Sequence, residues 1–130
     1  MANPNIVSVA TINGGNAGFN LSATTTSTLL TVASDKIVKI NTITIANVDG
    51  ANAATFNLFI DGLGSGAPGV TLNGQGATVY LAKTVSVPAD ATLSLLTSPI
   101  YLMEGDILKG GASAASDLDL FISYEILDDA

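Results

Sequence analysis

Apolar and polar residues alternate with a period of two along much of this chain, and this alternation restricts its fold more than any other feature. The clearest stretch is residues 117–126, where Leu118, Leu120 and Ile122 are separated by mostly polar neighbours such as Asp119. Successive side chains of a β-strand point to opposite faces, so the pattern predicts a strand with one buried and one exposed face.

Residues 37–46 form the longest predicted strand, and their alternation changes phase in the middle. Val38 and Ile40 would lie on one face, and Ile43 and Ile45 on the other, if the pairing were regular. A bulge at the two polar residues between these pairs would place all four side chains in the core. A bend between two sheets, or a strand buried on both faces, are the alternatives.

Three shorter runs alternate in a similar way, at residues 56–60, 79–87 and 93–95. Turn-forming pairs such as Asp49-Gly50 separate the runs, and no segment has the pattern of an amphipathic helix with caps. We therefore predict an all-β chain: a single antiparallel β-sandwich, jelly-roll-like, with about seven to nine short strands.

The length of 130 residues corresponds to one domain. Residues 17–130 are predicted to form the β-sandwich domain. Residues 1–16 are either an N-terminal arm or the first strand, because Asn13-Gly14-Gly15-Asn16 separates Ile6–Ile12 from the rest. An arm of this kind could add a strand to a neighbouring molecule.

The composition excludes several kinds of chemistry. The chain has no Cys and no His, which rules out disulfides, thiolate chemistry, a Ser-His-Asp triad and a His-ligated zinc site. A net charge of −7 opposes binding to nucleic acid or to an anionic membrane. No apolar run approaches the roughly 20 residues of a membrane-spanning helix, and the start of the chain lacks the basic region of a secretory signal. We expect a non-enzymatic protein with no cofactor.

Two features could bind a ligand, but a simpler interpretation fits each of them better. The glycine-rich stretch Gly62–Gly66 is followed by no helix pattern and no Lys-Ser or Lys-Thr, so we expect a loop rather than a phosphate site. Asp117, Asp119, Asp128 and Asp129 could bind calcium, which needs six to eight oxygen ligands. However, the first two are expected on the outward face of a strand, and the last two in a C-terminal tail. We predict no catalytic residue and no metal site.

Two phenylalanines stand out of phase with the apolar residues around them. Phe59 lies between Leu58 and Ile60, and Phe121 lies between Leu120 and Ile122. If the alternating residues face the core, both rings face outward and can anchor a subunit or partner contact. The alternative is that a loop or the N-terminal segment covers them within one molecule. The candidate interface residues are Ile6, Val7, Phe59 and Phe121.

A series of short stretches between Lys36 and Glu125 carries a family resemblance: Lys39–Asn47, Ala54–Phe56, Tyr80–Lys83, Val87–Ala89, Pro99–Asp106, Gly111–Leu118 and Ile122–Tyr124. In these stretches the chain resembles small all-β virion proteins of tailed bacteriophages, including phages that infect cyanobacteria. The resemblance carries no catalytic residues.

The resemblance implies a capsid decoration (cement) protein on the exterior of the virion, made in the host cytoplasm. Such a protein would bind the major capsid protein, stabilise the shell and form a homo-oligomer, with a trimer favoured. A tail, neck or fibre-associated virion component is the alternative within this class. A carbohydrate-binding or adhesion β-sandwich is a further alternative, from a different class.

Overall fold

The computed structural model describes residues 10–62, 71–73 and 76–128, and over these residues it contains nine β-strands and no helix. The strands are β1 (Thr11–Asn20), β2 (Ser27–Thr31), β3 (Lys36–Asn47), β4 (Ala54–Asp61), β5 (Thr78–Val87), β6 (Thr92–Ser94), β7 (Ile100–Leu102), β8 (Ile107–Ala112) and β9 (Leu118–Asp128). Consistent with this, no helix in the described part of the chain is long and apolar enough to cross a membrane.

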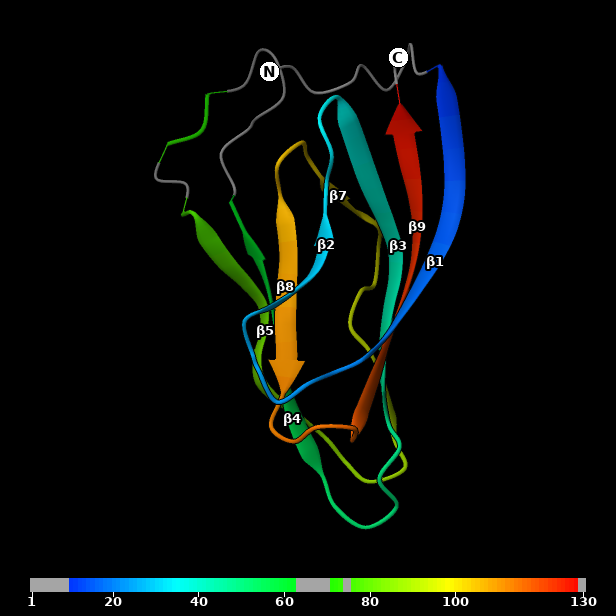
Figure 1. Ribbon diagram of the computed structural model, residues 1–130, viewed down its shortest axis with the longest axis vertical. Coiled ribbons are helices and arrows are strands. Elements are labelled where there is room, and N and C mark those ends of the chain that lie inside the picture. Colours follow the sequence, from blue (N-terminus) through cyan, green and yellow to red (C-terminus); the bar gives the residue numbers. More distant parts are fainter. Residues whose placement is uncertain (1–9, 63–70, 74–75, 129–130) are drawn as a thin grey trace.

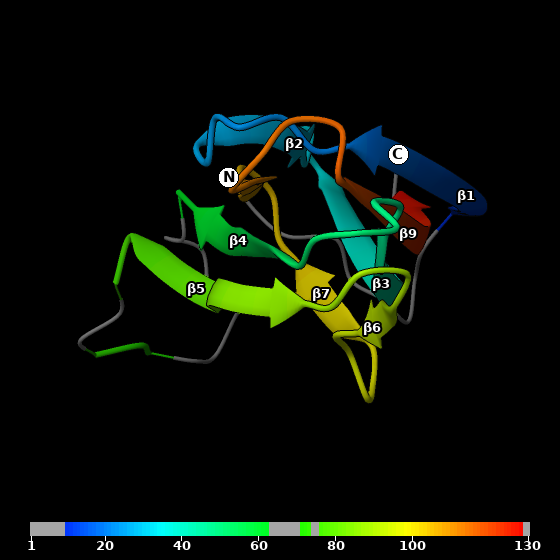
Figure 2. The ribbon, with the colours of Figure 1, turned by 90° about the horizontal axis from the view of Figure 1, so that it is seen from below.

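The strands form two antiparallel sheets that face each other (Figures 1 and 2). Sheet A has the order β1-β9-β3-β6, and β7 pairs with β3 as well. Sheet B has the order β2-β8-β4-β5. Because β6 and β7 pair with different stretches of β3, they together fill one strand position at the edge of sheet A.

This strand order is that of a jelly roll. When β6 and β7 are taken as one position, the chain fills about eight positions in two sheets, as in a double Greek key. Most connections, including that from β8 to β9, pass from one sheet to the other at the ends of the sandwich (Figure 1). The predicted all-β, jelly-roll-like sandwich is confirmed.

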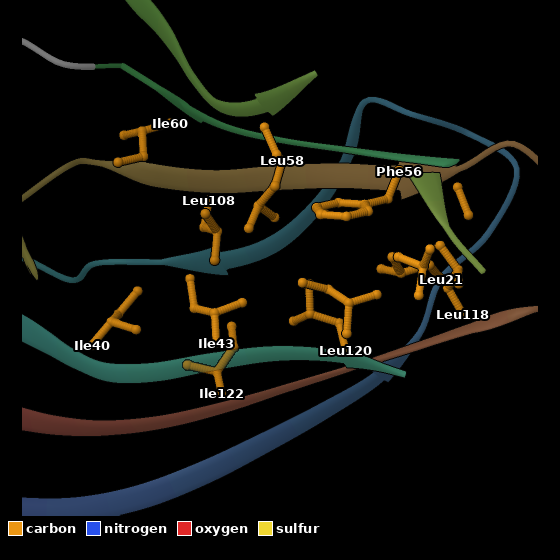
Figure 3. Packing of buried hydrophobic residues seen from close by; sticks show 14 of the residues in the cluster. Leu21, Ile40, Ile43, Phe56, Leu58, Ile60, Leu108, Leu118, Leu120 and Ile122 are labelled. Carbon is orange, nitrogen blue, oxygen red and sulfur yellow. The ribbon is translucent and has the colours of Figure 1, made fainter. Parts of the chain in front are cut away.

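The hydrophobic core fills the space between the two sheets (Figure 3). Phe56, Leu58 and Leu108 of sheet B point toward Ile43 and Ile122 of sheet A, and all five are buried. Each buried side chain of this size stabilises the fold by about 1.5–3 kcal/mol relative to an exposed one. The core therefore holds the two sheets face to face without any disulfide.

The phase change in β3 is a β-bulge. Its register against β9 shifts between Ile40 and Thr42, so Asn41 is the extra residue. As a result Val38, Ile40, Ile43 and Ile45 are all buried in the one core. Of the three explanations that the sequence left open, the bulge is the one found. It lies at Asn41, the first of the two polar residues at which it was predicted.

Two pairs of neighbouring glycines are parts of strands, including the pair at which the sequence suggested a break. Gly14 and Gly15 lie inside β1, which pairs with β9 without a register shift from Thr11 to Asn20. A side chain at Gly15 would overlap the ring of Tyr124, so glycine leaves room for that ring across β1. Similarly, Gly110 and Gly111 lie inside β8, which continues to Ala112.

The edge strand β5 is less regular than its sequence predicts. Its register against β4 shifts twice, between Phe56 and Leu58 and again between Leu58 and Phe59. The shifts break the expected alternation, so that Ala82 is buried. Thr84, in the first bulge, has a positive φ of 52°, and its backbone N–H donates to Asn57 Oδ1 at 2.6 Å.

Candidate interaction surface on sheet A

The ring of Phe121 is exposed on the outer face of sheet A. Its alternation with the buried residues Leu120 and Ile122 turns it away from the core, and 45% of its surface remains accessible. Its neighbours in the adjacent strands are Gly18 of β1 and Thr44 of β3. Because neither neighbour is large, the Phe121 ring has little beside it, and its predicted outward orientation is confirmed.

A shallow open groove of about 370 Å³ surrounds this ring. Its lining comes from the central strands β3 and β9 and the edge strand β1, and includes Gly18, Asn20, Thr44, Ala46, Asp119 and Phe121. Small residues form much of the floor, since the sheet here presents glycine, alanine and threonine to the solvent. An exposed aromatic ring over small neutral residues is a surface suited to contact with another molecule.

The polar part of the groove is a hydrogen-bonded pair. Asn20 Nδ2 donates to Asp119 Oδ1 at 2.7 Å, across the β1–β9 pair. The interaction joins the edge strand to the strand that carries Phe121. It also holds the carboxylate of Asp119 in place beside the Phe121 ring, so one side of the groove carries hydrogen-bond acceptors.

Phe59 does not share the exposure of Phe121. Although it is out of phase with the core residues of β4, only 6% of its surface is accessible, so the expectation that its ring faces solvent is wrong. The ring of Tyr80, from β5, lies 5.0 Å away between centroids at an angle of 40°. Lys83 Nζ lies over the Tyr80 ring, 5.2 Å from its centroid. Among the described residues, the cover comes from the neighbouring strand β5.

The remaining two candidate interface residues, Ile6 and Val7, lie outside the described residues. The first described residue, Ala10, donates its backbone N–H to Asp128 O at 2.9 Å, beside the start of β1. Most of the glycine-rich stretch after Gly62 likewise lies outside the described residues. Gly62 itself has a positive φ of 77°, which glycine adopts readily at the end of β4.

The aspartates considered for calcium are separated by the fold. Asp119 is bonded to Asn20, whereas Asp128 is the last residue of β9 and forms an ion pair of 2.9 Å with Lys36 Nζ. The expectation that Asp128 belongs to a tail is wrong, and Asp129 lies outside the described residues. Within the described part of the chain, no three His, Cys, Asp or Glu side chains are grouped so as to hold a metal ion.

Two buried carboxyl groups, at the end of the sandwich away from the Phe121 groove, were not singled out from the sequence. Glu104 and Asp106 belong to the tight turn between β7 and β8, and both are buried. Asp106 Oδ2 accepts a hydrogen bond of 2.9 Å from Met103 N, and Glu104 Oε2 accepts one from Asp35 N. Burial raises the pKa of Asp106, against the opposing effect of the Met103 hydrogen bond. These contacts shape the turn and the adjacent loop, which is a structural role.

Comparison with protein-family models, with curated proteins and with solved structures finds no match to this chain.

Proposed function

We propose that this chain is a non-enzymatic structural protein of a virion. In the form we favour, it is a capsid decoration (cement) protein that binds the major capsid protein on the exterior of the shell. The observation that carries the proposal is the exposed ring of Phe121 in a groove of small neutral residues. The resemblance of the sequence to small phage virion proteins suggests that the partner of this surface is a major capsid protein.

The chemistry of the surface supports a protein partner. Protein interfaces are enriched in aromatic residues and depleted of charge at their centres, and a few anchoring side chains supply most of the binding energy. Phe121 is such an anchor, and Asp119, the only acidic residue among the described residues that line the groove, is already bonded to Asn20. With 12% charged residues in the whole chain, few charges have to be desolvated where the chain contacts neighbours in a shell.

The fold agrees with this proposal without selecting it. Jelly rolls occur in viral capsid domains and also in lectins, so the function has to be argued from the surface rather than from the topology. The resemblance favours a trimeric homo-oligomer, and a tail, neck or fibre position in the virion is the alternative within the same class.

Sedimentation with capsids tests the proposal. Empty capsids would be assembled from the major capsid protein encoded in the same genome, mixed with this chain and pelleted. We expect the wild-type chain to pellet with the capsids and Phe121→Ser to lose at least about 90% of that binding, as expected for an anchoring aromatic residue. Val79→Ser is the control, because Val79 is 42% accessible and lies on β5 of sheet B, away from the proposed contact face. A wild-type chain that stays in the supernatant would refute the capsid assignment.

A second candidate function is supported by the same groove. An exposed aromatic ring beside a carboxylate and an amide is also an arrangement that can bind a carbohydrate, with the ring packing on the sugar and Asp119 and Asn20 accepting or donating hydrogen bonds. A glycan array separates the two functions. Binding to one class of glycan that is lost in Phe121→Ala, together with no capsid binding, would favour the carbohydrate-binding function.

A further inference from the structure

Strand β1 presents a long free edge. It is ten residues long, lies at the end of sheet A, and pairs only with β9 among the described strands. Its ladder with β9 runs from Thr11 to Asn20 with no bulge, and the strand contains no proline and no charged residue. Proteins usually protect edges from association with a short strand, a charge, a proline or a bulge, and β1 has none of these.

The other described edges are all protected. In sheet A, β6 and β7 have three residues each. In sheet B, β2 has five residues with a register shift against β8, and β5 has two register shifts and the exposed Lys83. The contrast makes β1 the edge that is open to another strand.

The ladder with β9 shows which backbone groups of β1 face outward. Leu21, just after the strand, donates its N–H to Leu118 O at 2.9 Å and continues the register in which odd-numbered residues bond to β9. In an antiparallel pair the bonding residues alternate, so the even-numbered residues direct their N–H and C=O groups to the free side. These residues are Ile12, Gly14, Asn16, Gly18 and Asn20.

We propose that β1 pairs in antiparallel fashion with β1 of a second copy of this chain, around a two-fold axis at Asn16. In this register all five outward-facing residues are used. Asn16 lies opposite the partner's Asn16, Gly14 opposite the partner's Gly18, and Ile12 opposite the partner's Asn20. The two copies of sheet A then join into one continuous sheet.

Charge favours a second copy as the occupant. Two chains of net charge −7 repel each other, and they can approach most easily where neither presents a charge. Every side chain of β1 is neutral, so the paired strands would bring no like charges opposite each other. The face of the sheet beside this edge is open too, because a Cβ atom added at Gly14 or Gly18 would meet nothing within 4 Å.

This inference is independent of the proposed function and concerns the free protein. It also departs from the trimer that the resemblance favours, because a contact around a two-fold axis gives a dimer. The dimer can be measured in the absence of any capsid or glycan, so its failure would leave the Phe121 surface untouched.

Cysteine crosslinking tests the register. The chain has no cysteine, so a single introduced thiol reports only on its own position. Asn16→Cys would place two thiols on directly opposed residues about 5.5 Å apart between Cα atoms, within the reach of a disulfide. Asn13→Cys is the matched control, because its two copies would be about 20 Å apart along the strands. We expect mild oxidation to crosslink Asn16→Cys at least about tenfold faster than Asn13→Cys, since only the former falls in disulfide range.

Sedimentation equilibrium tests the dimer itself on the full chain. We expect a monomer–dimer equilibrium for the wild type, and a dissociation constant at least about fivefold higher for Asn16→Lys, which sets two like charges opposite each other. Ser86→Lys on the exposed edge of β5 makes the same charge change and should leave the dimer unaffected. Unchanged far-UV circular dichroism verifies that both variants fold.

Three results would overturn the proposal. The first is a wild-type chain that is monomeric or trimeric at every concentration. The second is a dimer that Asn16→Lys leaves intact. The third is crosslinking that is as fast at Asn13→Cys as at Asn16→Cys.

Discussion

At the scale of single residues, two neighbouring glycines of β8 have other backbone segments packed directly against them. A Cβ atom at Gly110 would meet the carbonyl oxygen of Asn57. One at Gly111 would lie 2.7 Å from the carbonyl carbon of Thr24 and 2.9 Å from Ser22 O. The β1–β2 connection and β4 can therefore come this close to β8 only because these residues have no side chains.

Alanine substitutions test this close packing. We expect Gly111→Ala to lower the free energy of unfolding by about 2 kcal/mol, because backbone atoms have to move to admit the methyl group. Gly18→Ala is the matched control in another strand, since nothing lies within 4 Å of its Cβ position, and should change stability by less than about 1 kcal/mol. Urea unfolding of both variants measures the difference. Equal effects would contradict the packing described here.

The buried carboxyl of Asp106 gives a prediction about pH. Burial raises its pKa above the ordinary value of 3.8, so the folded chain holds this proton more tightly than the unfolded chain. As the pH rises through 3.8 and then through the raised pKa, this group therefore lowers the free energy of unfolding. Asp106→Asn removes the ionisation and keeps an oxygen for the Met103 N–H.

We expect the stability of Asp106→Asn relative to the wild type to be higher near pH 7 than near pH 3, by comparison of urea unfolding at the two values. Glu104 is left unchanged in both proteins, so the difference between them reports on Asp106. A difference that does not vary with pH would show that Asp106 does not titrate in this way.

At the scale of strands, the irregularities of β3 and β5 differ in how well the sequence predicts them. The bulge in β3 is visible because it separates two pairs of large apolar residues, Val38 and Ile40 from Ile43 and Ile45, and a phase change between such pairs has few explanations. The bulges in β5 cannot be predicted from its sequence. The strand lies at the edge of sheet B, and the alternation allows either Leu81 or Ala82 to face the core. The feature that marks the first of them is the side chain of Asn57 on the neighbouring strand, which accepts a hydrogen bond from the Thr84 N–H.

A substitution in the β5 bulge tests its strain. A positive φ costs a β-branched residue such as threonine about 1–2 kcal/mol, whereas asparagine tolerates this conformation better. We expect Thr84→Asn to raise the free energy of unfolding by about 0.5 kcal/mol, and Ser86→Asn, which lies on the same strand outside the bulge, to give no gain. Thermal unfolding of the two variants checks this. A loss of stability in Thr84→Asn would mean that the conformation at this site is not strained.

At the scale of the whole molecule, the class of fold and its two-sheet arrangement follow from the alternation of the sequence. The candidate site could be predicted only in part. Phe59 and Phe121 have the same pattern, and what separates them is the cover that a neighbouring strand supplies: Tyr80 packs on Phe59, whereas Gly18 leaves Phe121 open. Which strands become neighbours depends on the topology, and alternation within a single strand carries no information about it.

The two proposals also act at this scale, and both use sheet A, since Gly18 and Asn20 of β1 line the groove and also belong to the β1 edge. The Phe121 groove lies on the outer face and would contact a capsid, while the β1 edge would join two copies of the chain. A dimer built in this way places two Phe121 rings on one continuous sheet. One dimer would then contact the capsid through two copies of the same surface.

A cryo-electron microscopy map of the virion tests the proposed function most directly. We predict density for this jelly roll on the exterior of the capsid, with the outer face of sheet A and the Phe121 ring against the major capsid protein. Density for the chain in the tail, neck or fibres would place it elsewhere in the particle and contradict the capsid assignment. Purified virions that do not contain the chain would contradict a virion function altogether.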